Sequence, residues 1–220
     1  MKLNADQLRK LEEERAQGSM KQVKRNPIYF VLENIYDTYN IGGLFRLADA
    51  LAIEKIYLCG DSEIPPNARI KKASIGTYKV VPWEYRKSAA DTIADLNLKA
   101  ETRNSKQFQN SKNQNSTTPL SPPYQGGETG ETSNEVVKQL SNNLNIIAVE
   151  QSDKSVPYTK VNYSLPLVLI FGNESYGIKE ETLKLADQIV EIPMFGINKS
   201  LNVIVSAAIV SYWVISKIKT

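Results

Sequence analysis

Short apolar runs and helix-spaced apolar positions alternate along most of the chain, with polar loops between them. The run Leu-Val-Leu-Ile at 167–170 suits a strand that is covered on both faces, as in a parallel sheet. Similar runs predict further strands at 28–33, 55–59, 77–83 and 145–149. Helices are predicted at 4–23, 41–51, 67–74, 88–98, 135–140 and 203–218. The alternation predicts an α/β fold with a mainly parallel sheet flanked by helices.

A change of composition separates residues 101–134 from the rest of the chain. Asn, Gln, Ser, Thr, Pro and Gly dominate there, and such a stretch buries too little apolar area to offset the entropy lost on ordering. We therefore predict a disordered low-complexity insertion, which costs little because it only lengthens a surface loop. An inserted linker without a function of its own is favoured over a binding segment. The predicted organisation is a basic helical extension at 1–25 and one domain at 26–220 that the insertion interrupts.

Polar residues concentrate in two loops of the last third of the chain. The loop at 172–177 follows the predicted strand at 167–170, and a second loop at 193–199 follows a strand that ends near Ile192. The second loop leads into a long apolar helix, for which Ser200 is a candidate N-cap. Open α/β sheets bind ligands at the C-terminal ends of neighbouring parallel strands. These two loops are therefore the predicted ligand site.

The chain of 220 residues contains no histidine and a single cysteine, Cys59. This composition excludes a disulfide framework, the usual zinc sites and catalysis by Ser-His-Asp or Cys-His groups. Any catalysis must then use carboxylates, Lys, Arg, Tyr, Ser or backbone groups. The net charge of +3 is too small to indicate general coating of nucleic acids, although basic residues form two groups. These are Arg9, Arg15, Lys21, Lys24 and Arg25 near the N-terminus, and Arg69, Lys71 and Lys72 farther along.

Two patterns bear on location and assembly. The start of the chain lacks a secretory signal pattern and no apolar run is long enough to span a bilayer, so we expect a cytoplasmic protein without a membrane partner. The predicted helix at 203–218 is apolar on more faces than a single core-facing stripe needs. A dimer contact through this helix is favoured, and deep burial of the helix is the alternative.

The helix predicted after the first strand carries Asn40, Gly42 and Arg46 within two turns. Alone, these residues have an ordinary explanation, with Asn40 capping the helix, Gly42 allowing close packing and Arg46 in solvent. The two adjacent glycines cost on the order of 1 kcal/mol each relative to alanine, however, and a chain tolerates that where another backbone or a ligand comes close. The loop at 172–177 is not a phosphate-binding P-loop, because its lysine is wrongly spaced, and no dinucleotide-binding glycine pattern follows a strand.

Three segments together resemble the signature motifs of the SpoU (TrmH-like) family, a branch of the SPOUT RNA methyltransferases. Their order and their places at strand-to-loop junctions make the resemblance specific, and it spans about residues 28–216 outside the insertion. One departure is Ala52, which stands where the family usually has glycine. The matching residues are Asn40, Gly42 and Arg46 in the first motif, Gly172, Glu174 and Gly177 in the second, and 192–203 in the third.

The resemblance implies an α/β fold whose C-terminal segment forms a deep trefoil knot. It implies that the knot loops bind S-adenosylmethionine, that no metal is needed, and that residues 26–220 form the methyltransferase domain. The implied reaction is methyl transfer to a ribose 2′-hydroxyl of tRNA or rRNA, carried out by a homodimer. A non-catalytic RNA-binding protein of the same fold is the alternative, which the retention of the polar motif residues argues against.

The resemblance also implies which residues form the site. Arg46 would be catalytic, and Asn40 and Glu174 would hold it and the loop. A guanidinium stays protonated in proteins and is a poor base, so we expect Arg46 to orient the ribose and an adjacent phosphate through its forked donors; a role as base stays open. The implied cofactor-binding residues are Phe171, Gly172, Ile192, Met194, Gly196, Ser200, Leu201 and Asn202.

Overall fold

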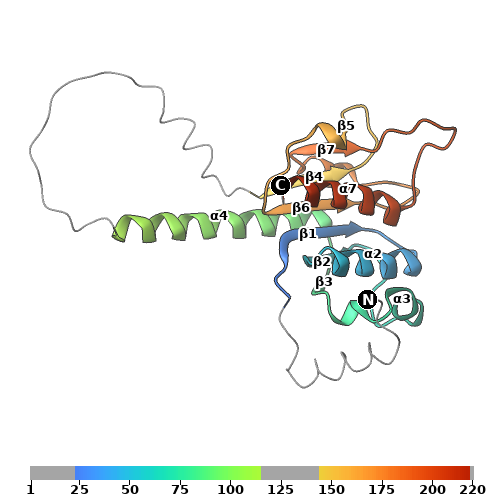
Figure 1. Ribbon diagram of the computed structural model, residues 1–220, viewed down its shortest axis with the longest axis horizontal. Coiled ribbons are helices and arrows are strands. Elements are labelled where there is room, and N and C mark those ends of the chain that lie inside the picture. Colours follow the sequence, from blue (N-terminus) through green and yellow to red (C-terminus); the bar gives the residue numbers. More distant parts are fainter. Residues whose placement is uncertain (1–22, 115–143, 219–220) are drawn as a thin grey trace, which may run out of the picture.

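The computed structural model of the protein describes residues 23–114 and 144–218. At its centre lies a seven-stranded sheet with the order β3-β2-β1-β6-β4-β7-β5, in which every pair of neighbours is parallel (Figure 1). The predicted α/β fold with a parallel sheet is therefore confirmed. The strands are β1 (Asn26–Glu33), β2 (Ile53–Cys59), β3 (Trp83–Arg86), β4 (Asn145–Val149), β5 (Val156–Pro157), β6 (Leu167–Phe171) and β7 (Gln188–Glu191).

Helices cover both faces of the sheet. One face packs against α2, α3 and α7, and the other packs against α4 and α6, as the two separate groups of buried side chains show (Figure 1). The helices are α2 (Thr38–Ala50), α3 (Ala68–Ser74), α4 (Ala89–Gln114), α6 (Glu180–Leu183) and α7 (Val203–Ile218), with short 3-10 turns η1 (Thr77–Lys79) and η2 (Tyr158–Lys160).

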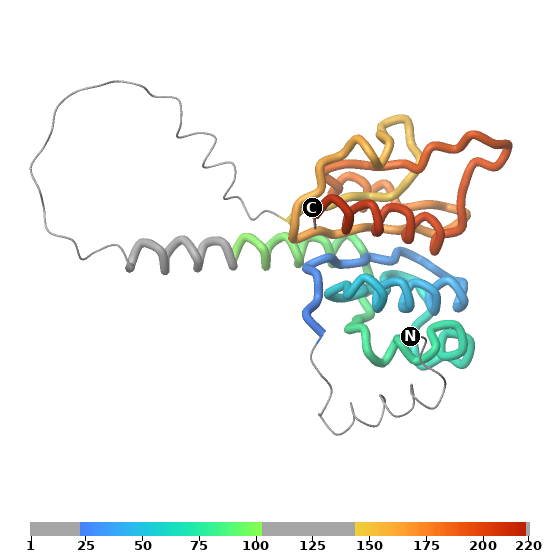
Figure 2. Tube along the Cα trace, in the orientation of Figure 1, coloured from blue at the N-terminus to red at the C-terminus, as the bar shows by residue number. Residues whose placement is uncertain are grey.

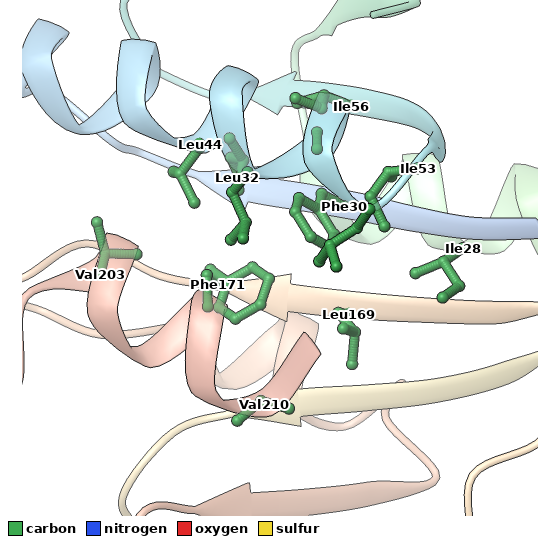
Figure 3. Packing of buried hydrophobic residues seen from close by; sticks show 14 of the residues in the cluster. Ile28, Phe30, Leu32, Leu44, Ile53, Ile56, Leu169, Phe171, Val203 and Val210 are labelled. Atoms are coloured by element: carbon green, nitrogen blue, oxygen red, sulfur yellow. The ribbon is translucent and has the colours of Figure 1, made fainter. Parts of the chain in front are cut away.

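The side chains of β1 show how the sheet is covered on both faces. Phe30 and the other β1 side chains that point to the same face pack beneath α2 and α7, whereas Val31 packs against α4 on the opposite face. Successive side chains of a strand point to opposite faces, which is why a nearly continuous apolar run is needed here. Phe30 meets Phe171 of β6 edge to face, with ring centroids 5.4 Å apart (Figure 3). This contact joins the neighbouring strands β1 and β6 in the core beneath α2 and α7.

The strand order brings the two polar regions of the sequence to one edge of the sheet. Strands β1 and β6 are neighbours, and Leu32 pairs with Phe171. The segment that leads from β1 into α2 therefore begins beside the segment that follows β6. Strand β7 lies two strands beyond β6, next to β4. The loops expected to bind a ligand thus meet at the C-terminal edge of the sheet, as predicted.

The predicted third strand at 77–83 is wrong in position. Residues Thr77–Lys79 form the 3-10 turn η1, and the strand β3 begins only at Trp83. The backbone N–H groups of Val80 and Val81 both donate to Thr77 O, at 2.9 Å, which turns the chain instead of extending it. Pro82 has no N–H group to give to a sheet. The apolar character at these positions reflects packing of the turn.

The helix α4 continues beyond the point where the sequence predicted disorder. It runs from Ala89 to Gln114, so residues 101–114 are helical and the predicted insertion begins too early. The first turns of α4 are anchored by buried residues such as Ile93, and extending an existing helix through polar residues costs little once it is nucleated. The remainder of the insertion, the predicted helix at 135–140 and nearly all of that at 4–23 lie outside the described residues.

Candidate functional site

A tight turn follows β6 at 172–177. Asn173 and Gly177 exchange backbone hydrogen bonds of 3.2 and 2.9 Å, and the Asn173 side-chain oxygen accepts from the N–H groups of Ser175 and Tyr176 at 2.8 and 3.0 Å. The turn closes on Gly172: a Cβ atom added there would lie 2.4 Å from the Gly177 carbonyl carbon. Only glycine fits at this position, because backbone atoms occupy the space that any side chain would need.

Asn173 also ties this turn to the segment after β1. Its side-chain N–H donates to Asn34 O at 2.9 Å, and the residue is only 7% exposed. Nearby, the buried Glu33 carboxylate accepts from the N–H of Lys179 at 2.9 Å and from the hydroxyl of Thr182 at 2.9 Å. The sequence reasoning did not single out Asn173. Its position between Gly172 and Glu174 was the available signal, but a side chain that holds a turn cannot be told from an exposed one by sequence alone.

Asn40 joins the three motif segments. Its side-chain N–H donates to the Glu174 carboxylate, and its side-chain oxygen accepts from Asn202 at 3.0 Å. Asn40 is 5% exposed, so the two hydrogen bonds form largely away from solvent. Buried amides are stable only when such partners are present. The first, second and third motifs are therefore held together by one side chain.

Both predicted helix caps are wrong. The helix α2 begins at Thr38, and its cap is Asp37, whose carboxylate accepts from the N–H of Tyr39 at 2.7 Å. The helix α7 begins after Asn202, whose side-chain oxygen accepts from the N–H of Ile204 at 2.9 Å, so Ser200 does not cap it. Asn40 lies inside the first turn of α2, and its polar groups are used between loops instead of at the helix end.

Arg46 lies on the exposed side of α2 and forms no hydrogen bond or ion pair with the part of the chain that the structure describes. Asn40 and Glu174 bind each other, and among the described residues neither forms a hydrogen bond or ion pair with Arg46, so the role expected of them in holding Arg46 stays a prediction. The glycines of α2 have a packing role. A Cβ at Gly42 would lie 2.4 Å from the Ala73 side chain of α3, so this glycine lets the two helices approach closely.

A cavity of about 430 Å³ lies between the loops that follow β4, β6 and β7. Gly196 is not among its lining residues. It belongs to the segment between β7 and α7, which projects past the sheet (Figure 2). Its neighbours Phe195 and Ile197 are 97% and 100% exposed. Asn202 also lies outside the lining and faces Asn40. The predicted cofactor residues that do line the cavity are Phe171, Gly172, Ile192, Met194, Ser200 and Leu201.

Carboxylates give the cavity a negative charge. Glu150, Glu174 and Glu191 line it, and its described lining contains no lysine or arginine. All three groups accept hydrogen bonds. Glu174 accepts from the Asn40 side chain, Glu150 accepts from the N–H of Ile178 at 2.9 Å, and Glu191 accepts from the hydroxyl of Ser155 at 2.8 Å. A cavity with this lining favours a ligand that carries positive charge, because opposite charges attract strongly where water is partly excluded.

Other chemistry has little support in the described residues. They contain no group of three His, Cys, Asp or Glu side chains that could hold a metal ion. Burial raises the pKa of the Cys59 thiol to about 12, so this group is protonated and unreactive at neutral pH. Within residues 23–114 and 144–218, no helix is both long and apolar enough to cross a membrane. The polar cavity beside Asn40 is the candidate site because six of the predicted cofactor residues line it.

The sequence matches the model of the SpoU rRNA Methylase family over residues 27–120 and 125–212. The chain belongs to this family. A tRNA (guanosine(18)-2′-O)-methyltransferase of Escherichia coli is 37% identical over 184 residues, which are 82% of this chain and 59% of that protein. A 23S rRNA (guanosine-2′-O-)-methyltransferase of Neisseria meningitidis is 25% identical over 191 residues, 87% of this chain and 59% of that protein. The chain thus spans about three fifths of the length of these curated relatives.

Solved structures of SpoU proteins share the fold. The SpoU methyltransferase AviRb from Streptomyces viridochromogenes, in complex with AdoMet, matches with a TM-score of 0.63 and 18% identity over 90% of this chain and 63% of that chain. The TrmH/SpoU tRNA modifying enzyme of A. aeolicus matches with a TM-score of 0.59 and 20% identity over 97% of this chain and 83% of that chain. The resemblance to SpoU proteins that the three motifs indicated is confirmed.

Proposed function

We propose that the protein is an S-adenosylmethionine-dependent RNA methyltransferase that transfers a methyl group to a ribose 2′-hydroxyl of tRNA or rRNA. The observation that carries this proposal is the junction at Asn40, which joins all three motif segments beside the charged cavity. Membership of the SpoU family supports it, as do the names of the relatives, one of which methylates tRNA and another 23S rRNA.

The cavity suits S-adenosylmethionine in size, shape and charge. Its volume of about 430 Å³ lies in the range of roughly 300–1,000 Å³ that is typical of small-molecule sites. Gly172 lets the turn at 172–177 close tightly at the cavity wall, and the carboxylates attract the positively charged sulfonium and ammonium groups. We assign binding to the six predicted residues that line the cavity. Asn202 is assigned a positioning role through Asn40, and Gly196 is assigned none.

When bound, the cofactor supplies a methyl group that is already activated by its positive sulfur. The chain then has to bring the ribose hydroxyl into line with that methyl group, and alignment alone can lower a barrier greatly. Among the described residues the Arg46 guanidinium has no hydrogen-bond or ion-pair partner, so it is available to orient the ribose and phosphate and to stabilise negative charge that develops on the 2′-oxygen. Asn40 and Glu174 fix the distance between α2, which carries Arg46, and the cavity.

The assembly is proposed to be a homodimer formed through α7. Val205 and Tyr212 are 45% and 55% exposed and lie along one face of this helix together with the half-buried Ile209. An apolar face of this kind is typical of a contact with another subunit. We also retain the deep trefoil knot between β6 and α7, a division into a basic extension at 1–25 and a methyltransferase domain, and a cytoplasmic location as expectations.

A matched pair of variants tests the proposed function. We expect Arg46→Ala to abolish transfer of tritiated methyl from S-adenosylmethionine to total RNA taken from cells that lack the protein, while calorimetry gives a cofactor affinity within about twofold of wild type. Lys99→Ala removes an exposed charge from α4, on the opposite face of the sheet, and should leave both properties unchanged. Failure of the wild-type protein to bind the cofactor would refute the proposal.

A non-catalytic RNA-binding protein of the same fold is the second candidate. In that case the wild-type protein would bind RNA without transferring methyl, and Arg46→Ala would change only RNA affinity. The intact network at Asn40 supports the enzyme, because simple binding does not need the first motif to be tied to the cofactor loops.

A further inference from the structure

A second hollow of about 600 Å³ lies outside the cofactor cavity, between the start of α2 and the start of α3. Tyr36 and Tyr39 line it from the α2 side, and Asn67 and Arg69 line it from the α3 side. The Asn67 side chain caps α3 by accepting from the N–H groups of Arg69 and Ile70, whereas the proposed chemistry gives no role to Tyr36, Tyr39 or Arg69. Figure 1 shows α2 and α3 side by side at one end of the sheet.

The two tyrosines of this hollow reach solvent. Tyr36 is 47% exposed and Tyr39 is 52% exposed. Aromatic rings that reach solvent in this way offer flat faces on which the bases of unpaired RNA stack. Glu63, which is also part of the hollow, can accept hydrogen bonds from the amino groups on the edge of a base.

Arg69 is the basic residue that lines the hollow, whose other charged lining residues are Asp37 and Glu63, and Lys71 and Lys72 lie farther along α3. Arg69, Lys71 and Lys72 are exposed, and none forms an ion pair or a side-chain hydrogen bond with the described part of the chain. Residues 68–83 contain basic side chains and no acidic one. A free guanidinium beside aromatic rings suits a phosphate next to a stacked base, because its forked donors match the phosphate oxygens.

The hollow has firm walls and lies next to the methyl-transfer site. The close approach of Gly42 to Ala73 packs α3 directly against α2, so the two sides cannot separate freely. Tyr39 immediately precedes Asn40, which binds Glu174 at the edge of the cofactor cavity. A strand of RNA whose ribose lies at Arg46 would therefore have its neighbouring nucleotides within reach of the hollow.

We propose that this hollow binds an unpaired nucleotide of the RNA, adjacent to the one that is methylated. Its base stacks on Tyr36 and Tyr39, its phosphate binds Arg69, and Glu63 reads the edge of the base. This inference rests on the proposed function. It adds a site that selects RNA in which the target lies in an unpaired segment, since a base inside a helix cannot reach the tyrosine rings.

The test measures methyl transfer by full-length variants to total RNA from cells that lack the protein. Tyr36→Ala, Tyr39→Ala and Arg69→Ala should each raise the RNA KM about tenfold or more and leave the affinity for S-adenosylmethionine within about twofold of wild type. Tyr39→Phe should keep most of the RNA affinity, because stacking does not need the hydroxyl. Arg69→Ala should also lower the slope of log K against log salt for RNA binding by about one.

Control variants separate the hollow from general effects. Tyr85→Ala removes a tyrosine that is 44% exposed on β3, and Lys99→Ala removes a charge on α4; both should leave the RNA KM unchanged. If the wild-type protein is active and all three hollow variants have an RNA KM within about twofold of it, the inference about the hollow is wrong. That result leaves the proposed function intact. Loss of cofactor affinity in the same variants would also overturn the inference about the hollow, since the residues would then be structural. A wild-type protein that transfers no methyl would overturn the proposed function together with this inference.

Discussion

Replacing Gly172 by alanine tests the shape of the cofactor cavity most sharply. The added Cβ would lie 2.4, 2.5 and 2.6 Å from three backbone atoms of Gly177 and Ile178. Backbone atoms cannot rotate away as side chains do, so the turn at 172–177 must shift. Forcing an extra carbon into a packed site costs about 1–3 kcal/mol, and for a chain of this size that corresponds to a fall in melting temperature of roughly 2–12 °C.

The same shift moves one wall of the cavity, so we expect at least a tenfold loss of affinity for S-adenosylmethionine. Thermal unfolding followed by circular dichroism, with and without the cofactor, measures both effects. Gly196→Ala is the matched control, because a Cβ there meets nothing within 4 Å. It should change stability by less than about 0.5 kcal/mol and leave cofactor affinity unchanged. If Gly172→Ala behaves as Gly196→Ala does, the described geometry of the turn is wrong.

Three further variants or probes examine other parts of the account. Asn40→Ala leaves Glu174 and Asn202 without their shared partner, so unfolding free energy should fall by about 1–2 kcal/mol in urea titrations; an unchanged value would contradict the junction. Ala52 has a φ of 50°, and Ala52→Gly should therefore raise the melting temperature slightly, by relief of about 1 kcal/mol of left-handed strain; a fall would refute this. Burial raises the Cys59 pKa from 9.0 to about 12, so this thiol should not react with a thiol reagent at pH 8 until the protein unfolds. Its contribution to the free energy of unfolding should be complete below pH 9 and decline from there to about pH 12. Rapid labelling of the folded protein would contradict the burial of Cys59.

The fold could be predicted because strands covered on both faces need nearly continuous apolar runs. The run at 167–170 became the buried strand β6, with each of its residues fully inside. The apolar content of residues 77–83 led to a wrong prediction of a strand there. A turn packs against the core at this point, and the strand begins only after Pro82. The polar composition of residues 101–114 led to a wrong prediction of disorder. Polar residues that cannot form a core can still extend a helix whose first turns pack against the core.

The sequence predicted several residues of the candidate site but not the hydrogen bonds between them. The motif residues Asn40, Glu174 and Asn202 were identified from their resemblance to a family pattern. Their contacts join residues 134 and 162 positions apart in the sequence, and no local pattern encodes such pairs. The role expected of Asn40 and Glu174 in holding Arg46 stays a prediction, since the described residues show these two bound to each other. Burial of Asn173, which fixes the turn, likewise depends on strands β1 and β6 being neighbours.

The central claim is that this site methylates the ribose of RNA. Total RNA from cells that lack the protein should be incubated with purified protein and S-adenosylmethionine, digested to nucleosides and analysed by mass spectrometry. We expect one 2′-O-methylnucleoside to increase with wild-type protein and not with Arg46→Ala. No increase in any 2′-O-methylnucleoside, or an increase only in nucleosides methylated on the base, would contradict the account.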